Sequence, residues 1–265
     1  MSAQTQTVTS ADGTTIAYQA YGEGPALVFV SGATQRKEDW TELAETMADS
    51  GFRAVTYDRR GRGDSGDTTP YAVEREIEDL AAVIAVNGGT AGLLGQSSGG
   101  ALANRATAAG LPITTLATFE TPYRVGEGPK PPVDYVEHLQ DLYDADDPAA
   151  MLEYFVLAGV GEPQEQVNQM KQTPFWESLV PVGRTVLYDA YCLGGSQAPL
   201  PTELLASITV PMLCLGSTGS PDWLRAGAEA SAQAAPDARF LVLEGEFHSA
   251  PASVLAPVLA EHLRR

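Results

Sequence analysis

Short apolar runs and helix-like periodic segments alternate through the first 120 residues of the chain. A continuous apolar run is typical of a strand covered on both faces, whereas apolar residues spaced three or four apart indicate one face of a helix. The pattern predicts strands at residues 5–9, 14–21, 26–30, 53–57, 90–94 and 113–119. It predicts helices at residues 38–50, 73–86 and 101–110. Such alternation indicates a parallel sheet with helices on both faces.

The alternation is interrupted at residues 121–205 and then resumes. The interrupting segment has little strand signal, and its apolar spacing predicts helices at residues 134–144, 148–159 and 174–193. After it, the pattern predicts strands at residues 210–215 and 239–243 and helices at residues 221–235 and 251–263. A sheet that is interrupted and later completed is one folding unit.

We therefore predict an α/β fold with a mostly parallel, doubly wound sheet of about eight strands. A helical cap is predicted to be inserted after the sixth strand. In this division residues 1–120 and 206–265 form the core domain, and residues 121–205 form the helical cap insertion.

Composition narrows the class of protein. With 265 residues, of which 44% are hydrophobic, the chain is long enough for one large domain with a sizeable core. No apolar run approaches the ~18 residues of a membrane span, and residues 1–7 lack a secretory signal pattern. The net charge of −18 disfavours binding to nucleic acid or to an anionic membrane. We expect a cytoplasmic protein whose partner is a small-molecule substrate, and the sequence leaves a homodimer open.

The segment Gly95-Gln96-Ser97-Ser98-Gly99 joins a predicted strand to a predicted helix. In this context Gly-x-Ser-x-Gly is typical of a nucleophile elbow, a tight turn that holds a serine in a strained conformation at the end of a strand. The residues two before and two after the serine must be very small, and both are glycine here. Ser97 is therefore the predicted nucleophile.

A serine hydroxyl needs a base within hydrogen-bonding distance, and the chain has three histidines. His138 lies in a predicted amphipathic helix of the insertion, and His262 lies near the basic end of the chain, so both are predicted to be solvated surface residues. His248 follows the last predicted strand. In a parallel sheet that loop opens at the carboxyl edge, where the elbow also places Ser97. We therefore predict that His248 is the base.

Four segments at predicted strand ends together resemble a known family: Ser31-Gly32-Ala33, Asp58-Arg59-Arg60-Gly61-Arg62-Gly63-Asp64-Ser65, the elbow, and Gly245-Glu246-Phe247-His248. In this order they make the chain similar to the α/β-hydrolase family over essentially its whole length, with residues 121–205 matching the helical cap of that family. The resemblance implies a serine, acid and histidine triad that works through an acyl-enzyme. It implies no metal and no organic cofactor. Cys192 and Cys214 have no metal-like spacing either.

The acid of the triad has two candidates. The loop where the family usually places it runs from Gly216 to Asp222, but no carboxylate occupies the usual position and Asp222 comes late, just after a proline. Glu120 ends the predicted strand after the elbow helix, and some branches of the family, the haloalkane dehalogenases among them, place their acid there. We favour Glu120 because catalytic groups lie at the carboxyl ends of strands. The alternative for Glu120 is a buried acid paired with Arg124 or with an arginine of the cap.

The resemblance assigns the oxyanion hole to the backbone N–H groups of Ala33 and Ser98. At Ser31 the chain departs from the family, which usually has a histidine before the glycine. Because the donors are backbone groups, this change is expected to alter how the loop is braced without removing the donors. The arginine-rich segment 58–65 lacks the Lys-Ser/Thr of a phosphate loop, so we predict a structural turn whose arginines pair with carboxylates.

These features predict a serine hydrolase that cleaves a carboxylic ester or lactone. The many aromatic residues of the cap indicate a small to medium, largely apolar substrate. A serine at the elbow argues against epoxide hydrolase or dehalogenase chemistry, since those branches of the family need an aspartate there. Hydrolysis of C–C bonds, perhydrolase chemistry and lyase or cyclase chemistry share the triad and stay open. A non-catalytic, ligand-binding protein of this fold also stays open.

Overall fold

The computed structural model describes residues 3–126, 128 and 130–265, so Glu127 and Pro129 of the predicted cap lie outside the described residues. Among the described residues, eight strands form one sheet in the order β1-β2-β4-β3-β5-β6-β7-β8. The strands are β1 (Gln6–Thr9), β2 (Thr15–Tyr21), β3 (Ala26–Val30), β4 (Arg53–Tyr57), β5 (Ala91–Gln96), β6 (Ile113–Phe119), β7 (Met212–Ser217) and β8 (Ala238–Leu243). The β1–β2 and β2–β4 pairs are antiparallel, and the other neighbouring pairs are parallel. The predicted α/β fold class is confirmed.

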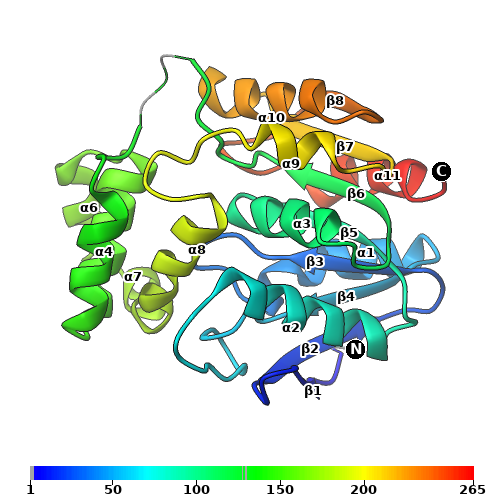
Figure 1. Ribbon diagram of the computed structural model, residues 1–265, viewed down its shortest axis with the longest axis horizontal. Coiled ribbons are helices and arrows are strands. Elements are labelled where there is room, and N and C mark those ends of the chain that lie inside the picture. The colour runs from blue at the N-terminus through cyan, green and yellow to red at the C-terminus, as the bar shows by residue number, and fades with distance from the viewer. Residues whose placement is uncertain (1–2, 127, 129) are drawn as a thin grey trace.

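Helices cover both faces of this sheet (Figure 1). One face carries α1 (Thr41–Asp49), which follows a short 3₁₀ helix (Lys37–Trp40), and α11 (Ala252–His262). The other face carries α2 (Val73–Val86), α3 (Ser98–Ala108) and α10 (Asp222–Ala234). Successive side chains of a strand point to opposite faces. Within β3, which is buried throughout, Val28 therefore packs against the second group of helices and Phe29 against the first.

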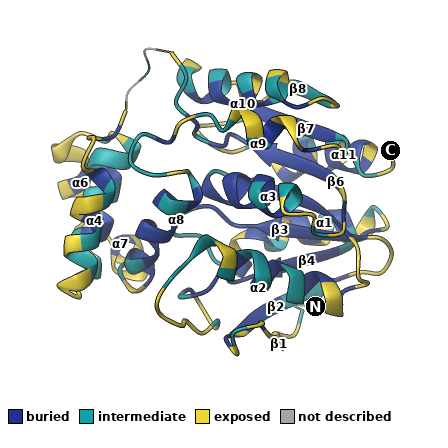
Figure 2. Cartoon of the chain, in the orientation of Figure 1, coloured by how far each residue is buried: buried dark blue, intermediate teal, exposed yellow. Residues whose placement is uncertain are grey.

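Between β6 and β7 the described chain is helical and leaves the sheet. Its elements are α4 (Tyr135–Asp144), α5 (Pro148–Tyr154), a π-helix (Phe155–Val160), α6 (Gln164–Met170), α7 (Pro174–Leu179), a 3₁₀ helix (Val180–Thr185), α8 (Val186–Cys192) and α9 (Thr202–Ala206). Figure 1 shows α4, α6 and α7 gathered beyond one end of the sheet, with α8 between them and the sheet. The outer faces of α4 and α6 are exposed, whereas the strands are largely buried (Figure 2). The predicted insertion after the sixth strand is confirmed.

The helices inside the insertion differ from the prediction. The continuous helix predicted for residues 174–193 is wrong, because that segment is divided into α7, the second 3₁₀ helix and α8. Pro181 lies at the division, and proline has no N–H group with which to continue an α-helix. Helix α6 was not predicted, and Val167 is its only buried residue among those described. With so little buried apolar surface, α6 leaves almost no periodic signal in the sequence.

His262 is not the surface residue that the sequence predicts. Its side chain is 0% exposed at the end of α11, and its Nε2 lies 3.0 Å from the carbonyl oxygen of Leu116. Nε2 must therefore donate, and the buried Nδ1 has no hydrogen-bond partner among the described residues. Burial lowers the pKa of His262. Helix α11 packs on the sheet up to its last turn. The basic residues that follow it suggest an exposed end instead, so the sequence does not indicate this packing. His138 is exposed, as predicted.

Candidate active site

Ser97 occupies a strained turn between β5 and α3. Its backbone φ is 54° and its ψ is −128°, a conformation that is costly for a residue with a side chain. A Cβ placed on Gly99 would lie 2.1 Å from the carbonyl oxygen of Val30, and one on Gly95 would lie 2.5 Å from that of Gly99. Only glycine fits at these two positions, as the elbow pattern predicts. The Ser97 N–H donates to the carbonyl of Phe119 at 2.9 Å, which ties the turn to β6.

Glu120 and His248 meet across the carboxyl edge of the sheet. Glu120 follows β6, and His248 lies in the loop between β8 and α11. The His248 Nδ1 lies 2.8 Å from Glu120 Oε2, although the two residues are 128 positions apart in the chain. The Glu120 carboxylate is 0% exposed, while the His248 side chain is 24% exposed. The structure thus brings together the predicted base and the favoured acid, and Glu120 does not pair with Arg124.

The loop after β7 holds Glu120 with neutral donors. The backbone N–H of Ser217 donates to Oε1 at 2.7 Å, and the Ser220 hydroxyl donates to Oε2 at 2.8 Å. The same hydroxyl accepts a hydrogen bond from the backbone N–H of His248 at 2.8 Å, so Ser220 positions both residues. In the sequence, this loop stands out only because it lacks a carboxylate at the usual position, and nothing marks its two serines as partners of Glu120. Asp222, the other acid candidate, is 98% exposed and pairs with Arg225.

Strained backbone conformations concentrate at this place. Six non-glycine residues of the described chain have a positive φ, and four of them are Thr34, Ser97, Glu120 and His248. Such conformations persist only where the surrounding structure enforces them, and they cluster at functional sites. The clustering points to this edge of the sheet as the active site. It also shows that the strain is spread over the ends of several strands.

The loop after β3 packs directly on the turn that carries Ser97. A Cβ on Gly32 would lie 2.9 Å from the Cβ of Ser97. The Gly32 N–H donates to Gln35 Oε1 at 2.7 Å, and Gln35 Nε2 donates to Gln96 Oε1 at 2.9 Å. Gln96 Nε2 in turn donates to the His248 carbonyl at 2.7 Å. This chain of hydrogen bonds joins the loop that carries Ala33 to the turn and to the histidine loop.

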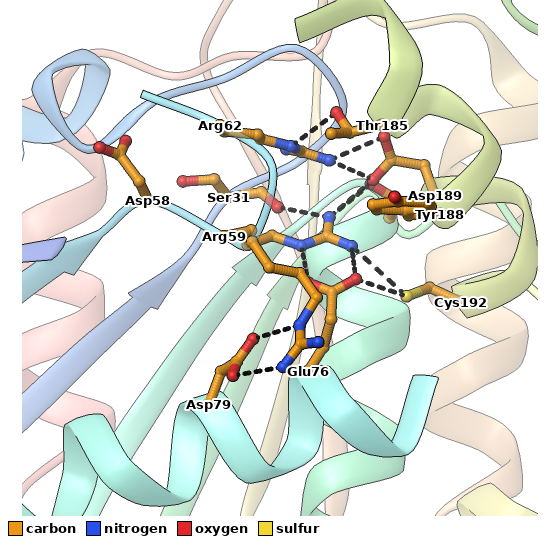
Figure 3. A network of polar contacts seen from close by, with 12 residues as sticks. Ser31, Asp58, Arg59, Arg62, Glu76, Asp79, Thr185, Tyr188, Asp189 and Cys192 are labelled. Atoms are coloured by element: carbon orange, nitrogen blue, oxygen red, sulfur yellow. Dashed lines mark hydrogen bonds and ion pairs between the residues drawn. The ribbon is translucent and has the colours of Figure 1, made fainter. Parts of the chain in front are cut away.

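The arginines of segment 58–65 pair with buried carboxylates, as predicted (Figure 3). Arg59 bridges Glu76 on α2, at 2.7 Å, and Asp189 on α8, at 2.6 Å. Arg62 reaches Asp189 at 2.8 Å, whereas Arg60 points elsewhere and pairs with Asp79 at 2.7 Å. All three arginines are at most 1% exposed. Segment 58–65 is therefore a structural turn that links the sheet, α2 and α8.

Ser97 and His248 line one cavity of about 250 Å³. Ala33 and Ser98, the predicted oxyanion donors, line it as well. The insertion supplies most of the apolar wall, which includes Tyr135, Phe155, Val160, Val186, Ala190 and Leu193. Trp223 and Phe247 come from the core. The cavity therefore joins the elbow to the insertion and presents a largely apolar surface to a bound molecule.

One wall of this cavity carries Arg124, which has no carboxylate partner among the described residues. Its Nη2 donates to the Gly159 carbonyl at 3.0 Å, and its guanidinium carbon lies 3.7 Å from the centre of the Trp223 ring. Burial lowers the pKa of Arg124 to about 10. Arg124 thus gives a positive charge to a wall that is otherwise mostly apolar.

The described residues form neither a metal site nor a disulfide nor a membrane-spanning helix. Within the described ranges, no group of three or more His, Cys, Asp and Glu residues is arranged to hold a metal ion. Cys192 and Cys214 are free thiols, and burial raises the pKa of each to about 12. In the same part of the chain, no helix has the length and apolar character needed to cross a membrane. The expectation that no cofactor takes part stays a prediction.

Comparison with known proteins extends these observations. The sequence model of the alpha/beta hydrolase family matches residues 27–255. A solved alpha/beta hydrolase from Sphaerobacter thermophilus is 45% identical, with 97% of this chain and 99% of that one covered and a TM-score of 0.89. An esterase from a Rhodococcus species shares the fold, with a TM-score of 0.66, 23% identity and coverage of 100% and 98%. A non-heme chloroperoxidase of Kitasatospora aureofaciens is 23% identical over 91% of this chain and 90% of its own length.

Proposed function

This chain belongs to the alpha/beta hydrolase family, and from that premise we propose that it hydrolyses a carboxylic ester or lactone through an acyl-enzyme. The observation that carries the proposal is the contact of 2.8 Å between Glu120 Oε2 and His248 Nδ1, on the wall of the cavity that Ser97 also lines. With Nδ1 hydrogen-bonded to a carboxylate, Nε2 is the ring nitrogen left to accept a proton from a serine.

In the proposed reaction, the Ser97 Oγ attacks the ester carbonyl carbon while His248 Nε2 takes the hydroxyl proton. Glu120 stabilises the resulting imidazolium without becoming protonated itself. The negative charge that develops on the carbonyl oxygen is bound by the N–H groups of Ala33 and Ser98. When the tetrahedral species collapses, the C–O bond of the ester breaks and His248 gives its proton to the leaving alcohol. Water then attacks the acyl-serine by the same steps, which releases the acid and restores Ser97.

The cavity supports a substrate of small to medium size. A volume of about 250 Å³ with mostly apolar walls favours aliphatic or aromatic acyl and alcohol groups. The loop that holds Glu120 supports the choice of acid, because Ser217 and Ser220 supply hydrogen bonds to a carboxylate that is removed from solvent.

The test combines a fluorophosphonate probe with a panel of aryl esters of rising acyl length. The wild-type protein is expected to be labelled at Ser97 and to hydrolyse short or medium esters, and Ser97→Ala is expected to do neither. Glu120→Gln should lose turnover, whereas Asp222→Asn should keep it within about twofold, because Asp222 is exposed and lies outside the cavity. If the wild-type protein binds esters but is neither labelled nor active, the proposal is wrong and a ligand-binding protein is indicated.

The similarity to a chloroperoxidase favours one second candidate, perhydrolysis. In that reaction hydrogen peroxide replaces water, and its attack on the acyl-serine gives a peroxycarboxylic acid and free Ser97. The same protein residues would take part, so the two activities differ only in the second nucleophile. If the protein catalyses perhydrolysis, a higher concentration of hydrogen peroxide at a constant ester concentration should raise the fraction of peracid among the products and lower the fraction of carboxylic acid. A product that stays acid at all peroxide concentrations excludes it.

A further inference from the structure

Both carbonyls of the loop from Ser31 to Gly32, the Gly32 N–H and the Ser31 hydroxyl each have a hydrogen-bond partner. The Ser31 carbonyl accepts a hydrogen bond from Arg59 Nη1 at 3.1 Å, and the Gly32 carbonyl accepts one from Arg62 Nη1. The Gly32 N–H is taken by Gln35, and the Ser31 hydroxyl accepts a bond from the Trp40 indole at 3.0 Å. Side chains from outside the loop therefore brace it: Gln35, Trp40, Arg59 and Arg62.

The hydrogen bond from Arg62 to the Gly32 carbonyl also affects the Ala33 N–H, the proposed oxyanion donor, because the two groups share one peptide unit. The carbonyl of Gly32 and the N–H of Ala33 belong to the same planar, trans peptide unit, so they point in opposite directions. A side chain that fixes the carbonyl oxygen therefore also fixes the direction of the N–H. A guanidinium on the oxygen also draws electron density through the peptide resonance, which makes the N–H a stronger donor.

Asp189 on α8 holds this guanidinium in place. Both of its oxygens lie 2.8 Å from Arg62 Nη2, and the Thr185 hydroxyl accepts a bond from Arg62 Nε at 3.0 Å. Figure 3 shows Arg59 and Arg62 converging on Asp189. Burial alone would raise the pKa of Asp189, but the charges of Arg62 and Arg59 hold it below its ordinary value. The carboxylate is therefore ionised at neutral pH.

Asp189 also contacts the second proposed donor residue. The Ser98 hydroxyl donates to Asp189 Oδ1 at 2.7 Å. Ser98 supplies the other backbone N–H of the proposed oxyanion hole, and it is the first residue of α3. One carboxylate of the insertion is thus joined to both donor residues, directly at Ser98 and through Arg62 at the Gly32–Ala33 peptide.

We propose that Arg62, oriented by Asp189, is a positioning residue that aims the Ala33 N–H at the developing oxyanion. The position of helix α8 thereby sets the geometry of the oxyanion hole. This inference rests on the proposed function, since it assigns a role within the same site. The proposed role of Arg62 does not depend on which substrate the protein binds, because Arg62 does not line the cavity.

The chain provides a matched control in Arg60. Arg60 is 0% exposed, comes from the same turn and is paired with two carboxylates, Asp79 at 2.7 Å and Asp12 at 2.9 Å. Its hydrogen bonds go to Asp79, Asp12 and the Arg75 carbonyl, away from the loop that carries Ala33. A loss of fold caused by disturbing a buried arginine should therefore affect Arg60→Lys and Arg62→Lys alike. After substitution of Arg62, Asp189 still has Arg59 as a partner, which favours retention of the fold.

The experiment compares an ester with the thionoester of the same acyl group. Sulfur is a weak hydrogen-bond acceptor, so a damaged oxyanion hole slows the ester more than the thionoester. Arg62→Gln is expected to lower kcat for the ester about 10- to 100-fold with little change in KM, and to lower the ester-to-thionoester ratio about tenfold. Arg62→Lys should restore part of that ratio because it keeps a cation. Asp189→Asn should lower the ratio by a smaller factor, and Arg60→Lys should leave it unchanged.

An activity-independent measurement accompanies the kinetics. In a ¹⁵N–¹H correlation spectrum, the Ala33 amide resonance is expected to shift and to exchange faster in Arg62→Gln but not in Arg60→Lys. The inference is overturned if Arg62→Gln leaves the ratio and the Ala33 signal as in the wild type, or if Arg60→Lys changes them equally. If the wild-type protein cleaves neither ester, the proposed function fails, and the Ala33 resonance still decides whether Arg62 orients that peptide.

Discussion

Two carboxylates at this site, Glu120 and Asp189, are both almost fully buried but have different kinds of partner. Glu120 accepts hydrogen bonds from the neutral donors Ser217 and Ser220 and faces the imidazole of His248. Asp189 faces two guanidinium groups, which stay charged at any pH that proteins tolerate. The partner of Glu120 can gain and lose a proton, and the partners of Asp189 cannot. Burial alone therefore does not distinguish a carboxylate suited to proton transfer from one that fixes the positions of structural elements.

The largest effect is expected from Glu120→Gln. The amide keeps the shape and can still accept from Ser217, but it cannot stabilise an imidazolium, so kcat for an aryl ester should fall about 10³- to 10⁴-fold. The urea midpoint should stay close to that of the wild type, because the amide has the same shape as the carboxylate and keeps the hydrogen bond from the Ser217 N–H. A kcat within tenfold of the wild type would show that the charge of Glu120 is not used in catalysis.

Asp189→Ala should have the opposite profile, with stability affected most. Removing this carboxylate leaves Arg62 as a buried cation without a charged partner, so the free energy of unfolding should fall by about 3–5 kcal/mol. Urea denaturation at neutral pH measures the change, and Asp222→Ala serves as the exposed control. If Asp189→Ala costs no more than the exposed control, the two guanidiniums do not depend on Asp189, and the contrast with Glu120 fails.

A smaller effect is expected from Ser220→Ala, which tests how a neutral donor supports Glu120. Its hydroxyl donates to Glu120 and accepts from the His248 backbone. A hydrogen bond to a charged group is worth roughly 1.5–3 kcal/mol, so kcat should fall about 10- to 100-fold. Thr218→Val is the matched control, because the Thr218 hydroxyl lies in the same loop and contacts Gly245 without reaching Glu120. Equal losses in the two variants would assign the effect to the loop as a whole.

The smallest effect is expected at His262, a third buried titratable group, which burial holds in its neutral form. Its pKa is lowered by burial from an ordinary value near 6.5, so the unfolded chain binds the proton more tightly. Stability from this residue is present above pH 6.5 and is lost as the pH falls through the lowered pKa. His262→Gln keeps a donor for Leu116 but does not titrate. The difference in melting temperature between the two proteins should therefore depend on pH between 7.5 and 5, and a constant difference would contradict this account.

The sheet could be predicted closely from the sequence. Residues 26–30, 53–57 and 113–119 match β3, β4 and β6 because continuous apolar runs in buried parallel strands give a local signal. The positions of Ser97 and His248 follow from this, since Ser97 directly follows β5 and His248 lies in the loop after β8. In the insertion the signal is weaker, because Pro181 interrupts one helix and α6 buries a single described residue.

The supports of the site could not be predicted, because they depend on contacts between distant parts of the chain. Ser217 and Ser220 lie 97 and 100 positions from Glu120, and Asp189 lies 127 positions from Arg62. A serine that holds a catalytic carboxylate looks the same in a sequence as a serine in any polar loop. Glu120 itself could be proposed because its position at a strand end is a local property. Its partners become visible only when β6, β7 and the loop after β8 are placed side by side.

The attachment of α8 to the turn that carries Ser97 and Ser98 has a consequence for redesign of the protein. Because Asp189 and Thr185 lie at or near α8 and hold Arg62, the proposed role of Arg62 implies that substitutions that shift this helix alter turnover of every substrate at once. Phe155 and Val160 belong to the π-helix and line the cavity with apolar side chains, which form no hydrogen bond with this arginine network. Under the proposed function, a library that varies these two positions is expected to change which acyl groups are accepted while the geometry around Arg62 stays constant. The insertion thus contains an adaptable segment beside one that must be left unchanged.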